Sequence, residues 1–175
     1  MHLSNYHSHC SFCDGRSMPE EFVKFALAKS FRAYGISSHG PLPFETFWNM
    51  SAFDMPEYLV EISRLKEKYQ GHLEIYTGME IDYLDTTYNP SIPYFQNLPL
   101  DYRIGSVHFL PIATELCEAN MVCIDGPFSE FKQAVDTYFE GDIRKMVKRY
   151  YESSIQMVEL GGIDIVGHLD KIYMN

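Results

Sequence analysis

The sequence predicts an α/β fold in which parallel strands alternate with helices. Five short, mostly apolar runs have the character of strands, and a helix or a long loop separates each from the next. Four of these runs end at a histidine and the other ends at a glutamate. Parallel strands direct their carboxyl ends to one face of a sheet or barrel, where such folds carry their chemistry. We therefore expect residues far apart in the sequence to meet at one rim.

The first strand, Leu3 to Tyr6, opens into a polar loop that begins with His7 and His9. Two histidines separated by one residue point to the same side of an extended segment, because side chains alternate across a strand. On its own this pair is weak evidence for a metal site, since histidines are also common on surfaces. Asp14 and Gly15 follow in the same loop.

Two helices and a second strand are expected before residue 72. The first helix, at about 18–31, opens with a proline and two acidic residues, which its first turn favours. A strand over 33–39 ends at His39, and an aromatic loop over 40–55 follows. Asp54 is then expected to cap the second helix, whose apolar residues recur at helical spacing as far as Gly71.

A third strand over 73–82 carries Glu80 shortly after Gly78, and a glycine in a strand allows another group to approach closely. Residues 89–97 suit a short helix or turn. A fourth strand over 101–108 ends at His108.

The last third of the chain is expected to be mainly helical. Residues 110–125 suit an irregular insertion or hairpin. A long helical region follows from about Phe128 to the glycines at 161–162. Its expected apolar face consists of Ile143, Met146, Val147, Tyr150, Tyr151, Ile155 and Val158. The fifth strand, over 163–168, ends at His168.

The strand ends together supply a set of metal-binding side chains. Imidazole nitrogens and carboxylates are ligands for zinc, manganese or iron, and a carboxylate has two oxygens with which to bridge two ions. The residues expected on one rim are His7, His9, His39, Glu80, His108 and His168.

Six short motifs occur in order along the whole chain. They are His7-x-His9, Asp14-Gly15, Ser38-His39, Gly78-x-Glu80, Gly105-Ser106-Val107-His108 and Gly167-His168. This series resembles the PHP (polymerase and histidinol phosphatase) superfamily and, more narrowly, its monofunctional histidinol-phosphate phosphatases. The resemblance implies a distorted (β/α)7 TIM-like barrel with a metal centre at its C-terminal rim.

The resemblance also implies which residues hold two or three divalent ions (Zn, Mn or Fe). His7 and His9 would hold the first ion, and Glu80 would bridge it to a second. His108 and His168 would complete the second, and Asp14 with His39 would hold a third. The residues implied to act in catalysis through the metals are Glu80, His7, His9 and His108.

One departure from the family pattern concerns the end of the chain. The family's last motif, an Asp-x-His, has no match after His168, and Asp170 lies too near to replace it. We therefore expect residues 1–175 to be one PHP domain that is incomplete at its C-terminus and holds only the first five strands. Open barrel edges would then favour a homo-oligomer or association with another segment.

The reaction implied by the resemblance is hydrolysis of L-histidinol phosphate to histidinol and phosphate in histidine biosynthesis, through a hydroxide activated between the metals. Arg16 and Arg103 are candidate phosphate contacts, although an ion pair is the commoner role of an exposed arginine. Trp48 could stack on the substrate or simply pack. Asp82 and Asp85 are interpreted as solvated loop acids.

Three alternatives remain open. Another PHP phosphoesterase, acting on nucleotides or phosphodiesters, could use the same metals. A truncated, non-catalytic metal-binding domain is the second alternative. Cys10-x-x-Cys13 could instead be a redox pair or half of a zinc site, but no second such motif follows.

Composition excludes several classes of partner. The formal net charge is −10 and there is no basic run, which argues against nucleic acid. No membrane span or signal peptide is recognisable. The four cysteines, which show no disulfide framework, are expected to be reduced. We therefore expect a cytoplasmic protein without a membrane partner.

Overall fold

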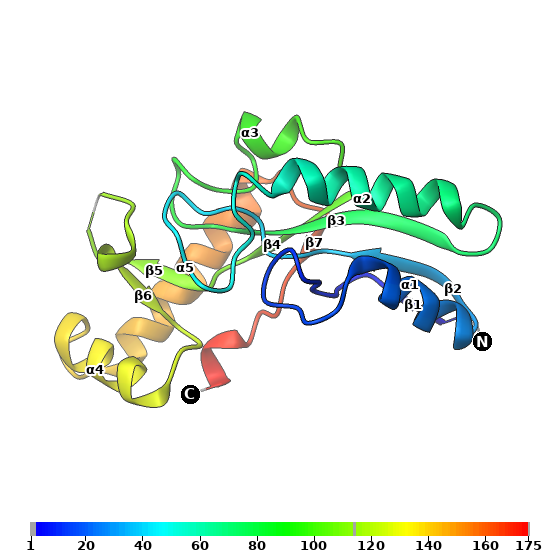
Figure 1. Cartoon of the computed structure of the whole chain (residues 1–175). Coiled ribbons are helices and arrows are strands. Elements are labelled where there is room, and N and C mark those ends of the chain that lie inside the picture. Colours follow the sequence, from blue (N-terminus) through cyan, green and yellow to red (C-terminus); the bar gives the residue numbers. More distant parts are fainter. Residues whose placement is uncertain (1–2, 114, 175) are drawn as a thin grey trace. The chain divides into compact units, whose positions relative to one another are not determined.

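The computed structural model describes residues 3–113 and 115–174 and has the expected α/β architecture (Figure 1). The order of elements follows the sequence prediction closely. The elements are β1 (Leu3–Asn5), α1 (Pro19–Ala28), β2 (Phe31–Ile36), α2 (Met55–Lys68), β3 (Glu74–Asp82), α3 (Pro93–Gln96), β4 (Tyr102–Ser106), β5 (Phe109–Pro111), η1 (Glu118–Asn120), β6 (Met121–Cys123), α4 (Phe128–Tyr138), α5 (Ile143–Leu160), β7 (Ile165–Val166) and η2 (Lys171–Met174).

The main sheet has the strand order β1-β2-β3-β4-β7. The pairs β1–β2 and β2–β3 are parallel, with α1 and α2 as the connections between them. Strands β5 and β6 form a separate antiparallel pair, which confirms the hairpin expected between residues 110 and 125.

The chain divides into two compact units. The first comprises the described residues up to Ile81 together with Asn97–Ile104. The second comprises Asp82–Gln96 and the described residues from Gly105 onward. The prediction of one incomplete domain over 1–175 stays a prediction.

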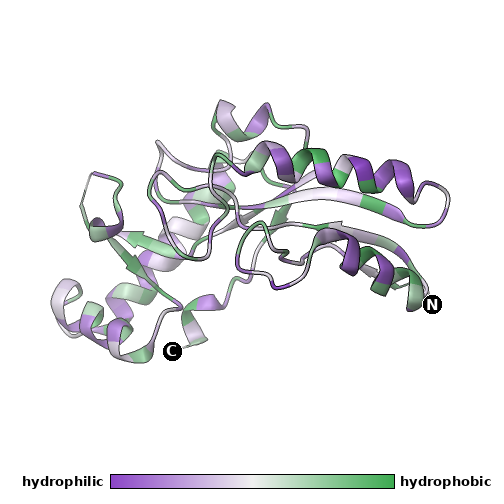
Figure 2. Cartoon of the chain, viewed as in Figure 1, coloured by the Kyte–Doolittle hydropathy of each residue, from purple (hydrophilic) through white to green (hydrophobic). Residues whose placement is uncertain are grey.

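In the first unit, the apolar faces of α1 and α2 supply a buried core. Helix α1 contacts both β2 and α2, and hydrophobic and hydrophilic residues alternate along α2 (Figure 2). Tyr58, Ile62 and Leu65 of α2 are fully buried. The Tyr58 hydroxyl lies 2.8 Å from the Ile36 carbonyl oxygen and 2.7 Å from that of Gly78, so one side chain ties β2 to β3.

Gly78 is needed because an aromatic ring lies directly against it, as the sequence suggested. A Cβ atom built there would lie 2.2 Å from Cζ of Tyr102, and one built at Gly35 would lie 2.2 Å from the Tyr102 hydroxyl oxygen. That hydroxyl donates a hydrogen bond to the carbonyl of Tyr6 at 2.6 Å. Tyr102 therefore packs over two glycines and anchors the backbone just before His7.

In the second unit, α4 contacts β6 and α5 contacts β5 around a separate hydrophobic core. The long helical region predicted from Phe128 is in fact two helices. The break falls at Glu140 and Gly141, whose φ angles of 57° and 71° are left-handed and incompatible with a continuing α-helix.

The apolar face predicted for α5 is also partly wrong. Met146, Tyr150 and Met157 are buried, whereas Ile155 and Val158 are 56% and 50% exposed. The buried stripe follows the i, i+4, i+7 positions from Met146 to Ser153, and Ile155 falls outside it.

Asp54 occupies the N-cap position of α2 as predicted, but its side chain does not bond the helix. Its carboxylate instead accepts a hydrogen bond from the Ser51 hydroxyl at 2.7 Å.

Candidate metal centre

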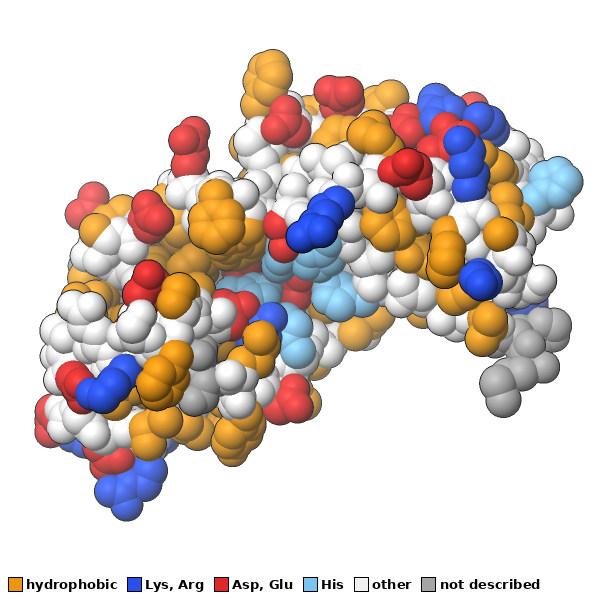
Figure 3. Space-filling model, turned by 60° about the horizontal axis from the view of Figure 1, so that its bottom comes forward, with side chains coloured by type: hydrophobic (Ala, Val, Ile, Leu, Met, Phe, Trp, Pro, Cys, Tyr) orange, Lys and Arg blue, Asp and Glu red, His pale blue; other side chains and the backbone are white. Residues whose placement is uncertain are grey.

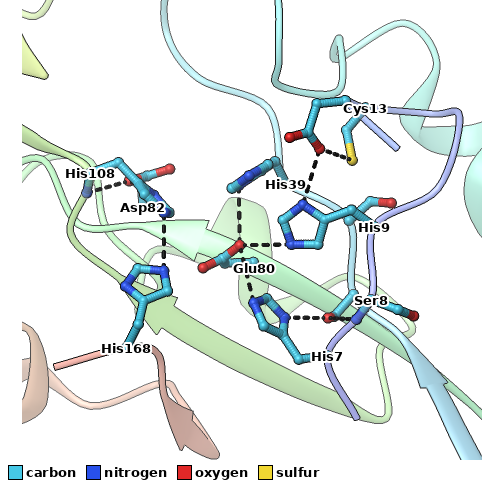
Figure 4. A network of polar contacts seen from close by, with 12 residues as sticks. His7, Ser8, His9, Cys13, His39, Glu80, Asp82, His108 and His168 are labelled. Carbon is cyan, nitrogen blue, oxygen red and sulfur yellow. Dashed lines mark hydrogen bonds and ion pairs between the residues drawn. The ribbon is translucent and has the colours of Figure 1, made fainter. Parts of the chain in front are cut away.

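Five of the predicted ligands lie together in the first unit: His7, His9, Asp14, His39 and Glu80. We call them the first-unit cluster. Figure 4 labels the three histidines and Glu80. His7 and His9 follow β1, and His39 follows β2. His39 also forms an isolated parallel bridge with Glu80, which lies near the end of β3. Three successive parallel strands thus deliver these side chains to one place.

Glu80 is the centre of this cluster. Its side chain is buried, and three imidazoles approach the same oxygen, Oε2. Nε2 of His9 lies 3.1 Å away, Nδ1 of His39 3.2 Å and Nε2 of His7 3.8 Å. A buried carboxylate is stable only when charged or polar groups surround it, so the imidazoles and Glu80 require one another.

The surroundings of His9 favour its charged form. Burial by itself would lower the pKa of this imidazole, but the contacts with Cys13 and Glu80 outweigh it and raise the pKa to about 10. Binding of a cation would therefore displace a proton from a site that already attracts positive charge.

Asp14 lies against the other nitrogen of the His9 ring. Its Oδ1 is 3.1 Å from His9 Nδ1, and its side chain remains 45% exposed. Partial burial would raise the pKa of this carboxyl, but the neighbouring His9 and His39 lower it overall. Asp14 is thus an ionised ligand candidate at the open side of the cluster.

Hydrogen bonds fix the orientation of His7. Its Nδ1 lies 2.9 Å from Oγ of Ser37, and the backbone N–H of Ser8 donates to the same hydroxyl oxygen at 3.3 Å. With Nδ1 engaged by Ser37, Nε2 is the nitrogen that points toward Glu80 (Figure 4).

The predicted substrate contacts take different positions. Trp48 packs against His39 with ring centroids 4.5 Å apart. Arg16 is exposed in the loop after Asp14. Arg103, the second residue of β4, donates a hydrogen bond to the Leu98 carbonyl at 3.0 Å. Contact of these three residues with a substrate stays a prediction.

The second unit holds another group, Asp82, His108 and His168, which we call the second-unit cluster (Figure 4). Nε2 of His108 lies 3.1 Å from Nε2 of His168. Oδ1 of Asp82 lies 2.8 Å from Nδ1 of His108. The two histidines predicted to share an ion therefore lie side by side.

Asp82 was missed by sequence reasoning, and its interpretation as a solvated loop acid is wrong. It is only 3% exposed and is the last residue of β3. Its spacing of two residues from Glu80 was the available signal, since residues i and i+2 of a strand share a face.

Asp125 is a further acidic residue of the second unit. Burial opposes its ionisation, but His108, Cys123 and Lys171 lower its pKa overall. Its carboxylate forms an ion pair with Lys171 at 3.1 Å.

Two of the four cysteines, Cys10 and Cys123, have a raised pKa. All four are free, as expected. Cys10 is fully buried with its sulfur 3.1 Å from the Ser38 hydroxyl, and burial raises its pKa. Burial likewise raises the pKa of Cys123 to about 12. Reactive thiols need a lowered pKa, so the raised pKa of Cys10 argues against a redox role for this thiol.

The face shown in Figure 3 carries charged side chains of both signs. On the face shown in Figure 3, Lys and Arg side chains occur in small groups, with acidic side chains near them. No helix in the described part of the chain has both the length and the apolar character needed to cross a membrane.

Within the first unit, two sets of side chains have the spacing of metal ligands. In each of the sets His7–His9–Glu80 and His9–Asp14–His39, the ligand atoms lie within 4.8 Å of one another. Nitrogen and carboxylate oxygen donors at this spacing suit a divalent transition metal.

Comparison with known proteins places this geometry in a family. Over 171 residues the chain is 28% identical to "Probable histidinol-phosphatase" of Deinococcus radiodurans, covering 96% of this chain and 60% of the relative. It is 31% identical over 160 residues to histidinol-phosphatase of Bacillus subtilis, covering 84% of this chain and 56% of the relative. The chain thus spans somewhat over half the length of these relatives.

A solved structure shares the fold. Histidinol phosphate phosphatase from Lactococcus lactis, in complex with zinc, L-histidinol and phosphate, superimposes with a TM-score of 0.72 at 22% identity. The match covers 97% of this chain and 58% of that one. The model of the PHP domain matches residues 5–175, through both units. The chain therefore belongs to the PHP domain family.

Proposed function

We propose that this chain acts as a metal-dependent phosphatase that hydrolyses L-histidinol phosphate to histidinol and phosphate, a step of histidine biosynthesis. The observation that carries the proposal is the buried carboxylate of Glu80, which three imidazoles from successive strand ends approach within 3.8 Å. The names of the matched relatives and the zinc, histidinol and phosphate bound by the Lactococcus lactis protein support the metal and the substrate.

The donor atoms fit divalent ions in both clusters. Two nitrogens that each lie ~2.0–2.1 Å from a tetrahedral zinc ion are roughly 3.3 Å apart. The Nε2 atoms of His108 and His168 are 3.1 Å apart, close to that spacing. We assign His7 and His9 to one ion, Asp14 and His39 to another, and His108 and His168 to a third. Glu80 is the proposed bridging carboxylate.

Bound divalent ions would supply positive charge for the phosphoryl oxygens and increase the acidity of a water molecule. The residues of the chain hold the site in shape. Glu80 provides the negative charge that gathers the imidazoles, and Ser37 fixes the ring of His7. Asp14 keeps an ionised, partly exposed oxygen at the open side.

For the organic part of the substrate, we propose contacts at the rim of the first-unit cluster. Trp48, packed edge-on against His39, presents an aromatic surface next to the metal ligands. Arg16, exposed in the adjoining loop, is the proposed phosphate contact. We also propose a cytoplasmic location, in keeping with four free cysteines.

The test is turnover by the purified chain after loading with zinc or manganese. Phosphate release is measured from L-histidinol phosphate, p-nitrophenyl phosphate and bis-p-nitrophenyl phosphate, and bound metal is counted by elemental analysis. Preference for histidinol phosphate supports the proposal. Preference for the diester would favour another PHP phosphoesterase, and bound metal without turnover on any substrate would indicate a non-catalytic metal-binding domain.

Association through open sheet edges stays a prediction. Size-exclusion chromatography with light scattering on the same preparation checks it, and a monomer at all concentrations would contradict it.

A further inference from the structure

Asp82 is the one buried acid in the second-unit cluster that neither the sequence motifs nor the proposed ligand set uses. Its side chain is 1% exposed, so its carboxylate is held away from water. Burying a carboxylate costs free energy unless hydrogen bonds compensate, so the groups that contact Asp82 are needed to keep it buried.

Asp82 makes two hydrogen-bond contacts with one residue, His108. Oδ1 accepts from the backbone N–H of His108 at 3.1 Å and lies 2.8 Å from Nδ1 of its ring. One oxygen thus holds the backbone and the imidazole of His108 together. These two contacts fix both the position of the imidazole ring and its rotation about the side-chain bonds.

The contact also selects the tautomer of His108. Oδ1 already acts as an acceptor for the backbone N–H of His108, and the same acceptor oxygen faces Nδ1 of the ring, so Nδ1 is the nitrogen that carries the hydrogen. Nε2 is then the nitrogen with the lone pair. It is the atom that faces His168 at 3.1 Å, which is where a shared ion would be bound.

We propose that Asp82 is a positioning residue for metal binding, which keeps His108 in the Nδ1–H tautomer and presents Nε2 for coordination. This inference rests on the proposed metal site and adds to it a residue outside the ligand set. Asp82 touches neither substrate nor ion. It acts through His108, and the negative charge behind the ring increases the basicity of Nε2.

Two substitutions separate the effects of geometry and charge. In Asp82→Asn, the side-chain carbonyl oxygen can still accept both hydrogen bonds, but the charge is lost. In Asp82→Ala, both the acceptor and the charge are lost. Outer partners of metal-bound histidines typically contribute ~10- to 100-fold to metal affinity. We expect zinc affinity to fall by about that factor in Asp82→Ala and by less in Asp82→Asn.

Asp85→Ala is the matched control. Asp85 is an aspartate three positions further along, and its Oδ1 accepts hydrogen bonds from Thr87 and Tyr88 rather than from a histidine. Loss of this turn contact should affect stability and leave zinc affinity unchanged. Circular dichroism and thermal unfolding identify any variant that fails to fold, and Asp82→Asn then serves as the informative variant.

The decisive measurement is the tautomer of His108 in the metal-free protein, read from ring ¹⁵N chemical shifts, together with zinc affinity from competition with a chelator. We expect the Nδ1–H form in the wild type and in Asp82→Asn, and a change toward the Nε2–H form in Asp82→Ala. A purely structural role would leave the tautomer unchanged.

An unchanged tautomer and unchanged zinc affinity in folded Asp82→Ala would overturn the inference, even if the wild type hydrolyses histidinol phosphate. Conversely, if the wild type binds zinc and the variants behave as expected but no phosphate is released, the proposed function fails while the role of Asp82 stands.

Discussion

The two clusters use the same residue types in different ways. In the first-unit cluster the carboxylate is central, because one oxygen of Glu80 meets three imidazoles. In the second-unit cluster the carboxylate stands behind an imidazole, because Asp82 binds Nδ1 of His108 while Nε2 faces His168. The comparison teaches that a buried acid near histidines can gather several imidazoles at one oxygen, as Glu80 does, or hold the backbone and ring of a single histidine, as Asp82 does.

The largest effect is expected from Glu80→Gln. The amide keeps the shape of the side chain but removes the charge that gathers the imidazoles and is proposed to bridge two ions. Phosphate release should fall by more than the ~100-fold upper range seen for outer partners of metal ligands. Thermal unfolding should change far less. Steady-state kinetics with metal analysis measure both.

Glu74→Gln is the control for that substitution. Glu74 begins the same strand, and its side chain is 51% exposed beside Arg32. Its turnover should equal that of the wild type. Unchanged turnover in metal-loaded Glu80→Gln would contradict the proposed role of Glu80 in the metal centre.

The next prediction tests whether the clusters hold separate ions. His9→Asn should release metal from the first-unit cluster, because His9 contacts both Glu80 and Asp14. His168→Asn should release only the ion assigned with His108. Equilibrium dialysis followed by elemental analysis counts the ions per chain. Complete metal loss in His168→Asn would contradict separate binding.

A smaller effect, on stability, is expected from Gly78→Ala. The new Cβ would meet the Tyr102 ring at 2.2 Å, and that ring is held by the hydrogen bond to Tyr6. Overpacking of this kind typically costs about 1–3 kcal/mol. Urea denaturation should therefore show a lower midpoint. Metal binding should also be weaker, because the backbone before His7 shifts.

Gly126→Ala provides the comparison, since its Cβ would lie 3.6 Å from the nearest atom, an ordinary contact. Its denaturation midpoint should stay close to that of the wild type. Equal midpoints for the two variants would show that Tyr102 can move without cost.

The smallest effect is expected away from both clusters, at Glu20. Its carboxylate accepts hydrogen bonds from Lys68, Tyr69 and Arg64 of α2 and its C-cap, and these contacts lower its pKa from 4.5 to about 2. A folded-state pKa below the unfolded one means that this stabilisation is present above about pH 4.5 and is lost as the pH falls toward 2.

Glu20→Gln should therefore unfold at a slightly lower temperature than the wild type at pH 7, with the difference shrinking between pH 4.5 and 2. Added salt should also reduce the difference, because the contacts are exposed. Thermal melts across this pH range provide the measurement. A difference that grows as the pH falls would have the wrong sign and would exclude this linkage.

The sequence by itself determined the order of the main elements and most of the side chains that meet in the first-unit cluster. The strands could be predicted because each apolar run ends in glycine, proline or a polar residue. Because parallel strands share the direction of their carboxyl ends, the sequence alone predicts that His7, His9, His39 and Glu80 converge. Gly78 was likewise recognised as a point of close approach.

Only the tertiary structure decided which side chain packs against Gly78 and which acidic residues are buried. Tyr102 lies 24 positions beyond Gly78 in the sequence, and no local pattern links the two. Nothing in the local sequence distinguishes Asp82 from an exposed loop aspartate. Its burial depends on a contact with His108, which lies 26 residues further along the chain. The break at Glu140 and the rotated face of α5 also follow from packing, because hydrophobic periodicity defines a stripe on a helix but not the core that the stripe meets.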